Sequence, residues 1–98
     1  MTNIDVNLKQ EHIDRGVAND AALNPASLAI QDALPGVKGG VEARKMSTWL
    51  FRSRLDLPRG VPLDTPASVR NFIRDFDAGR DVEPFTFELE VPEWAVRR

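Results

Sequence analysis

The stretch TPASVRNFIRDFDAGRDVEPFTFELEV, residues 65–91, carries the strongest secondary-structure signals of the chain. Its first half holds apolar side chains at i, i+3, i+4 and i+7, namely Val69, Phe72, Ile73 and Phe76. This spacing predicts a helix that buries one face. We expect Thr65 to be its N-cap, Pro66 to occupy its first position, and Gly79 to end it in a left-handed conformation.

The second half of that stretch predicts a strand over residues 85–91. Apolar and polar side chains alternate there, with Glu88 and Glu90 on the solvent face. The same period of two recurs at residues 4–8, which predicts a second half-buried strand near the N-terminus.

Two further helices are expected between these regions. Residues 10–15 favour one short helical turn, and Gly16 stands where a left-handed residue would end it. Asn24 is a strong N-cap, and Pro25 suits the first helical position because its missing N–H costs nothing there. A helix is therefore predicted from Pro25 to Leu34, where Pro35-Gly36 stops it.

Residues 41–54 fit two patterns. As a helix, they would place Met46, Trp49 and Leu50 on one face, and as strands they would place Trp49 and Phe51 together. We favour one or two strands, because the segment is rich in β-forming residues and lies between Gly39-Gly40 and a Pro-rich stretch that predicts a loop over residues 57–63.

The predicted order of elements indicates one α+β domain over residues 1–98. We expect a small three- to four-stranded, mostly antiparallel sheet with helices packed on one face, and residues 92–98 as an extended C-terminal tail. The first residues show no secretory pattern and no apolar run reaches membrane-spanning length, so we expect a cytoplasmic protein that does not enter a membrane.

Composition argues against several kinds of chemistry. The chain has no cysteine and one histidine, His12, so we expect no metal site and no cofactor. No nucleophile elbow or glycine-rich phosphate loop is present, so we expect no catalytic residues and no enzyme activity. His12 is predicted to be an ordinary helix-surface or capping residue, and a pocket joining it to a carboxylate would argue for an enzyme.

Charge is unevenly distributed although the net charge is only −2. Residues 38–59 hold six basic and two acidic side chains, and residues 75–93 hold seven acidic side chains and one arginine. A nucleic-acid interface is therefore one hypothesis, with aromatic rings at Trp49 and Phe51 and cations at Arg44, Lys45, Arg52 and Arg54. The alternative interpretation places both rings in the core and the cations on a solvated edge, where they pair with the acidic last strand.

The C-terminus offers a second candidate interface. Trp94 is followed by Arg97 and Arg98, and tryptophan and arginine are enriched at the centres of protein–protein interfaces. The alternative is that Trp94 folds back over the sheet. An unpaired edge strand would also permit homodimerisation.

Several stretches, EHIDRG (11–16), PASLAI (25–30), VRNFIRDFDAGR (69–80) and PFTFEL (84–89), resemble short proteins of actinobacteriophages and actinobacterial genomes. Relatives often carry Cys-x-x-Cys before the second helix, whereas this chain has Ala21 and Asn24 there. The resemblance implies a phage accessory protein in a bacterial host cytoplasm and brings no activity with it. We therefore expect a non-enzymatic protein that binds a host or phage protein, or itself, with nucleic-acid binding as the alternative.

Overall fold

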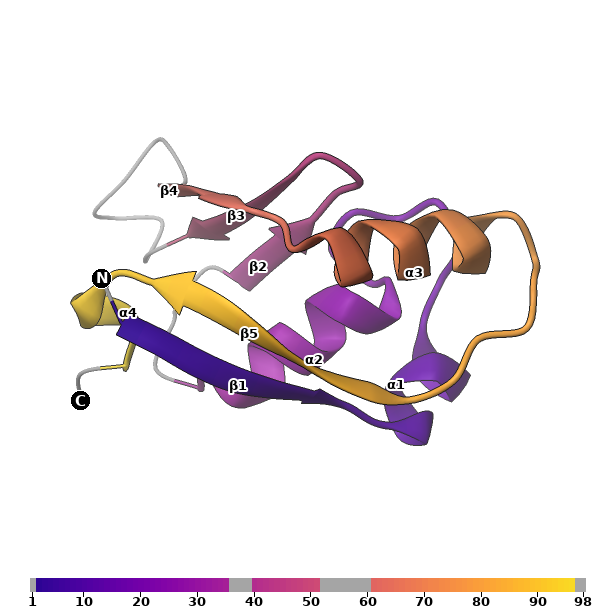
Figure 1. The fold of residues 1–98 in the computed structure, drawn as a ribbon, viewed down its shortest axis with the longest axis horizontal. Coiled ribbons are helices and arrows are strands. Elements are labelled where there is room, and N and C mark those ends of the chain that lie inside the picture. Colours follow the sequence, from indigo (N-terminus) through magenta and orange to yellow (C-terminus); the bar gives the residue numbers. More distant parts are fainter. Residues whose placement is uncertain (1, 36–39, 52–60, 97–98) are drawn as a thin grey trace.

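The computed structural model describes residues 2–35, 40–51 and 61–96, which form the strands and helices drawn in Figure 1. In chain order these are β1 (Thr2–Leu8), α1 (Gln10–Arg15), α2 (Pro25–Ala33), β2 (Gly40–Ala43), β3 (Ser47–Phe51), β4 (Val61–Asp64), α3 (Ala67–Asp77), β5 (Phe85–Val91) and α4 (Glu93–Val96). The predicted α+β class and its antiparallel pairing are confirmed, but the strands form two sheets rather than one.

The first sheet is a ribbon made by the two ends of the chain. β1 pairs antiparallel with β5 in an unbroken register from Thr2↔Val91 to Leu8↔Phe85. Alternate side chains, including Val6 and Leu89, are buried. The intervening side chains are exposed, so both strands show the predicted alternation.

The second sheet is an antiparallel meander in the order β2-β3-β4. Strands are thus confirmed in residues 41–51 in place of a helix. The strand β4 was not predicted, because Pro62 at its second position is typical of a loop. Pro62 is tolerated because β4 is an edge strand, where a missing N–H breaks no ladder.

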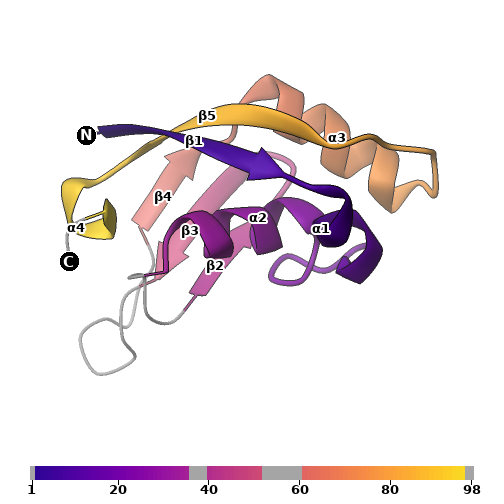
Figure 2. The same cartoon turned by 90° about the horizontal axis from the view of Figure 1, so that it is seen from below.

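Helix α2 packs against β1 of one sheet and β2 of the other, as Figures 1 and 2 show from two sides. Its inner face carries the buried Ala26, Ala29 and Ile30. The predicted N-cap is confirmed, since the Asn24 side chain accepts a bond from Ser27 N–H at 2.9 Å. α2 therefore holds the two sheets about one core.

Three predicted helix-end roles are wrong. Pro66 takes the N-cap position of α3, and the Thr65 hydroxyl instead bonds the Thr48 hydroxyl at 2.9 Å within the core. Gly16 has an ordinary φ of −68°, so it is not left-handed. It is needed for space, because a Cβ there would lie 2.5 Å from the ring of Pro25.

The predicted end of α3 is confirmed. Gly79 has φ +77°, which favours glycine, and its N–H bonds the carbonyl of Phe76. The next N–H, from Arg80, reaches back to the carbonyl of Asp75, which completes a Schellman motif. None of the helices in the described parts of the chain is both long and apolar enough to cross a membrane.

Candidate functional site

The C-terminal candidate surface is built around a short helix. Residues 93–96 form α4, so this part of the predicted tail is not extended. Trp94 is half-buried and packs against the core, as the alternative interpretation of this residue required. Arg97 and Arg98 lie outside the described residues. Trp94 therefore offers a partner only part of its ring.

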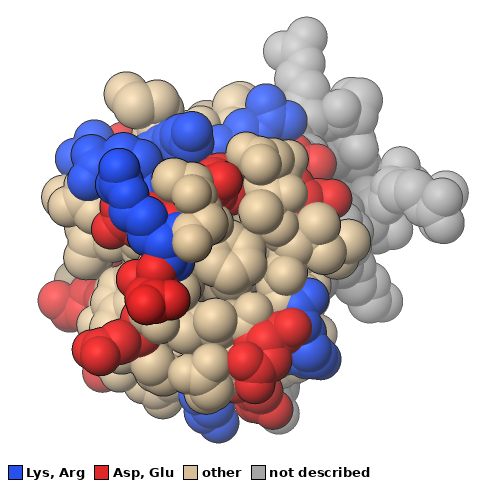
Figure 3. Space-filling model, turned by 90° about the vertical axis from the view of Figure 1, so that its right-hand side faces the viewer, with Lys and Arg blue, Asp and Glu red and all other residues tan. Residues whose placement is uncertain are grey.

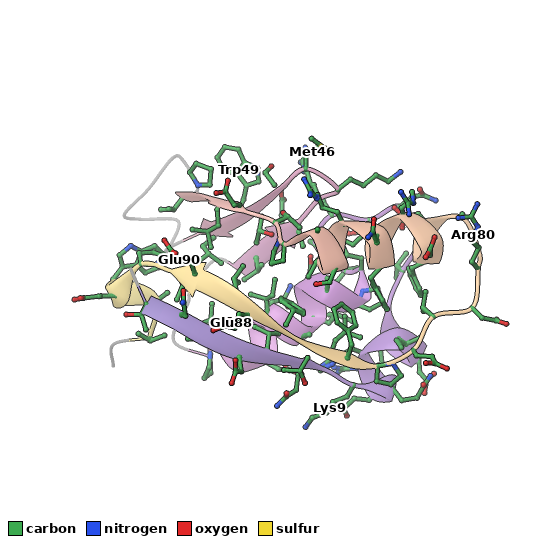
Figure 4. The ribbon with its side chains drawn as sticks, viewed as in Figure 1. Lys9, Met46, Trp49, Arg80, Glu88 and Glu90 are labelled. Atoms are coloured by element: carbon green, nitrogen blue, oxygen red, sulfur yellow. The ribbon has the colours of Figure 1, made fainter. Side chains whose placement is uncertain are left out.

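The basic candidate surface begins at the turn between β2 and β3. Arg44 and Lys45 are exposed there, and Arg52 and Arg54 lie outside the described residues. Trp49 is half-buried on the outer side of β3, opposite Glu42 and Pro62, and its indole N–H donates to Ser47. Figure 4 shows Met46 and Trp49 on this side of the second sheet. The side chain of Phe51 also lies outside what the structure describes.

Acidic groups accompany those cations. The guanidinium of Arg44 lies 3.3 Å from the carboxylate of Glu42. A hollow of about 200 Å³ beside Arg44 and Lys45 is also lined by Asp20 and Asp77. On the face seen in Figure 3, Lys and Arg gather along one side with Asp and Glu among and below them. Mixed charge of this kind attracts a phosphate backbone weakly.

His12 is buried, with only 2% of its surface exposed. Its Nδ1 accepts the backbone N–H of Lys9 at 2.9 Å, which caps α1. Its Nε2 donates to the carboxylate of Asp32 on α2 at 2.6 Å. The predicted capping role is confirmed and the helix-surface placement is wrong. Because the two residues are twenty positions apart, no local sequence pattern indicates the pair.

A pocket does join His12 to a carboxylate, the arrangement that would argue for an enzyme. In a catalytic dyad, however, one ring nitrogen bonds the carboxylate and the other faces the substrate. Here the second nitrogen is occupied by the backbone N–H of Lys9. Neither nitrogen has a free lone pair, so the pair acts as a link between α1 and α2.

The same bonds oppose a metal ion. Glu11, His12 and Asp32 bring ligand atoms within 4.8 Å of one another. A histidine that binds a metal through Nε2 normally donates a proton from Nδ1 to a neighbour. At His12 that neighbour is a donor, the N–H of Lys9. A metal ion on Nε2 would leave the ring proton on Nδ1, where it would face the N–H of Lys9. The bond from Lys9 that caps α1 would then be lost.

The hollow beside His12 runs along the outer edge of β1. It measures about 220 Å³, and α2 forms its far wall. Small side chains, Ala29 and Ala33, line the helix side, and polar side chains rim it: Asp5, Asn7, Lys9 and Asp32. We call this hollow the β1 groove. Residues 5 and 7 lie on the predicted solvent face of the first strand, but no pattern in the sequence joins them to α2.

β1 has a free edge at this groove. Its ladder partner is β5, and within the described residues its backbone has no other hydrogen-bond partner. Every second residue of such a strand turns an N–H and a C=O away from the ladder. The groove therefore combines unpaired backbone groups with a helix on its opposite side.

The outer face of the ribbon next to the groove is acidic. Asp5 lies directly across from Glu88, and Asn3 across from Glu90, with all four side chains exposed. Within the described residues, none of these three carboxylates forms an ion pair. Figure 4 shows Glu88 and Glu90 along β5, and Lys9 just beyond the end of β1. No protein-family model, curated protein or solved structure matches the chain.

Proposed function

We propose that this protein is a non-enzymatic binding protein that takes up an extended segment of a partner protein at the free edge of β1. The observation that carries the proposal is the β1 groove, where an unpaired strand edge faces a helix across a hollow lined by Ala29 and Ala33. Peptides that add a strand to a sheet gain affinity from backbone bonds and specificity from alternate side chains.

The free edge of β1 is better suited to this role than the edge of β5 that does not pair with β1. β5 is bracketed by Pro84 and Pro92, and it approaches β4 of the other sheet. β1 has no proline and no bulge in its register, and its one adjoining lysine, Lys9, follows the strand. Prolines, bulges and lysines are the usual means of blocking a strand edge.

The resemblance to actinobacteriophage proteins supports a setting for this activity. On that basis the partner is a host or phage protein, and the protein acts as a phage accessory factor in the bacterial cytoplasm. A small protein can act there by occupying a surface of another protein.

Blocking the groove tests the proposal. Ala33→Arg places a long side chain in the groove at the last residue of α2. Ala78→Arg, at the exposed C-cap of α3, is the matched control. Each tagged full-length protein is used to capture partners from a nuclease-treated actinobacterial lysate. We expect one protein to be retained by the wild type and by the control, and lost by Ala33→Arg at unchanged thermal stability.

The bound partner should also slow hydrogen–deuterium exchange in residues 2–8, because it would pair the outward N–H groups of β1. Equal retention by Ala33→Arg would contradict the proposal. Retention that is seen only in a parallel lysate without nuclease would also contradict it.

A second candidate function is nucleic-acid binding by the β2–β3 turn. The observation in its favour is that Arg44 and Lys45 are exposed beside a sheet whose outer face carries Trp49. It predicts binding of single-stranded DNA with a log–log salt slope of about −0.7 per phosphate contacted. The double variant Arg44→Glu/Lys45→Glu should abolish that binding, and unchanged affinity would exclude this surface.

A further inference from the structure

We infer that the segment accepted by β1 is basic, with lysine or arginine at alternate positions. This inference rests on the proposed function, because it specifies the occupant of the same groove. Its basis is the charge on both sides of the free edge: Asp5 on the outer face of the ribbon and Asp32 on the opposing helix.

The outer face carries negative charge, with Lys9 as the one cation among the residues that line the groove. Asp5 and Glu88 are direct cross-strand neighbours, and like charges in that relation repel each other. Neither has an ion-pair partner within the described residues, and both are exposed. A strand added beside β1 would place alternate side chains on this same face, next to Asp5. A cation there would reduce the repulsion, and an anion would increase it.

The groove side has the same preference. The carboxylate of Asp32 is 59% exposed, and one of its oxygens, Oδ2, bonds His12. The guanidinium of Arg15 approaches that same oxygen at 3.8 Å. The other oxygen has no bond within the described residues and can accept one from a partner side chain. Ala29 and Ala33 leave space for the stem of a long basic residue.

A second copy of the chain is a poor occupant of this edge. Asp5 is the central residue of β1, which spans Thr2–Leu8. Full antiparallel pairing of two β1 strands about a twofold axis would set Asp5 opposite the same residue of the second copy. That pairing adds a repulsion, whereas a basic segment removes one.

Three capped heptapeptides, matched to the length of β1, provide the test. Valine alternates with lysine in the first peptide, with glutamine in the second and with glutamate in the third. Affinity for the full-length protein is measured by fluorescence anisotropy, and hydrogen–deuterium exchange of residues 2–8 locates the bound peptide. We expect the lysine peptide to bind tightest, the glutamate peptide to bind weakest, and bound peptide to protect β1.

Asp5→Asn removes one charge with almost no change in shape. It should weaken the lysine peptide about 2- to 5-fold, the range typical of an exposed ion pair, and leave the glutamine peptide unchanged. Asp81→Asn, at an exposed position in the loop before β5, is the matched control and should change neither affinity.

The outcomes separate the two proposals. If the lysine and glutamine peptides bind equally and both protect β1, the basic preference is wrong and strand addition stands. If the lysine peptide binds without protecting β1, strand addition at this edge is wrong. If none of the peptides binds, both proposals fail.

Discussion

Replacing His12 with leucine should destabilise the protein strongly, although the substitution keeps a side chain of similar size. The wild-type ring makes two bonds from a buried position, one to the N–H of Lys9 at 2.9 Å and one to Asp32 at 2.6 Å. Leucine removes both bonds and leaves the Lys9 N–H without its partner.

The size of the loss follows from those two bonds. The neutral bond from Lys9 contributes about 1 kcal/mol, and the bond to the Asp32 carboxylate contributes about 1.5 kcal/mol, the low end for a charged acceptor because Asp32 is largely exposed. The expected loss in free energy of unfolding is therefore about 2.5 kcal/mol. In a domain of this length it corresponds to a fall in Tm of about 10–20 °C.

Urea unfolding followed by tryptophan fluorescence measures this loss, and a double-mutant cycle assigns it. Asp32→Ala removes the acceptor alone, so the cycle of His12→Leu with Asp32→Ala should show a coupling energy of about 1–2 kcal/mol. His12→Gln keeps one acceptor and one donor and should recover part of the stability. A loss below about 0.5 kcal/mol in His12→Leu, within the range of ordinary surface changes, would refute this account of the link.

Three other substitutions test the fold by thermal or urea unfolding. Gly16→Ala should lower the free energy of unfolding by about 1–3 kcal/mol, because its Cβ would meet the ring of Pro25 at 2.5 Å. No loss would mean that α1 and α2 can separate freely. Gly79→Ala should lower the free energy of unfolding by about 1–2 kcal/mol through its left-handed φ alone, since the space around it is open. A larger loss would contradict the open surroundings. Asn24→Ala should lower the free energy of unfolding at least as much as Gly79→Ala, because the Asn24 side chain caps α2 and also donates to the carbonyl of Ala43 at 2.8 Å. A neutral effect would exclude this link between α2 and β2.

Local patterns predicted the elements that have one buried face. The alternation in residues 4–8 and 85–91 and the helical stripe of α3 arise because one side of each element meets the core. The helix-end residues were less reliable: Asn24 and Gly79 act as predicted, but Thr65 and Gly16 do not. Their roles depend on a neighbour from another element, Thr48 in one case and Pro25 in the other.

The candidate site was less predictable than the fold. Asp5 and Glu88 were each assigned to a solvent face, but their direct opposition requires the pairing of the first strand with the last. The basic segment at 38–59 is separate from the acidic one in sequence, yet Arg44 and Lys45 share a hollow with Asp20 and Asp77. Charge counted along the chain left open whether the two segments face each other, and the hollow brings Asp77 of the acidic segment beside Arg44 and Lys45 of the basic one.

By itself, the sequence determined the class of the fold, the place of most elements and the outward faces of the two ribbon strands, because these depend on contacts between residues a few positions apart. Tertiary structure alone decided that the strands form two sheets, that His12 is buried against Asp32, and that β1 keeps a free edge facing α2. Those features join distant segments, and their geometry follows from how the sheets pack around one helix rather than from any local pattern.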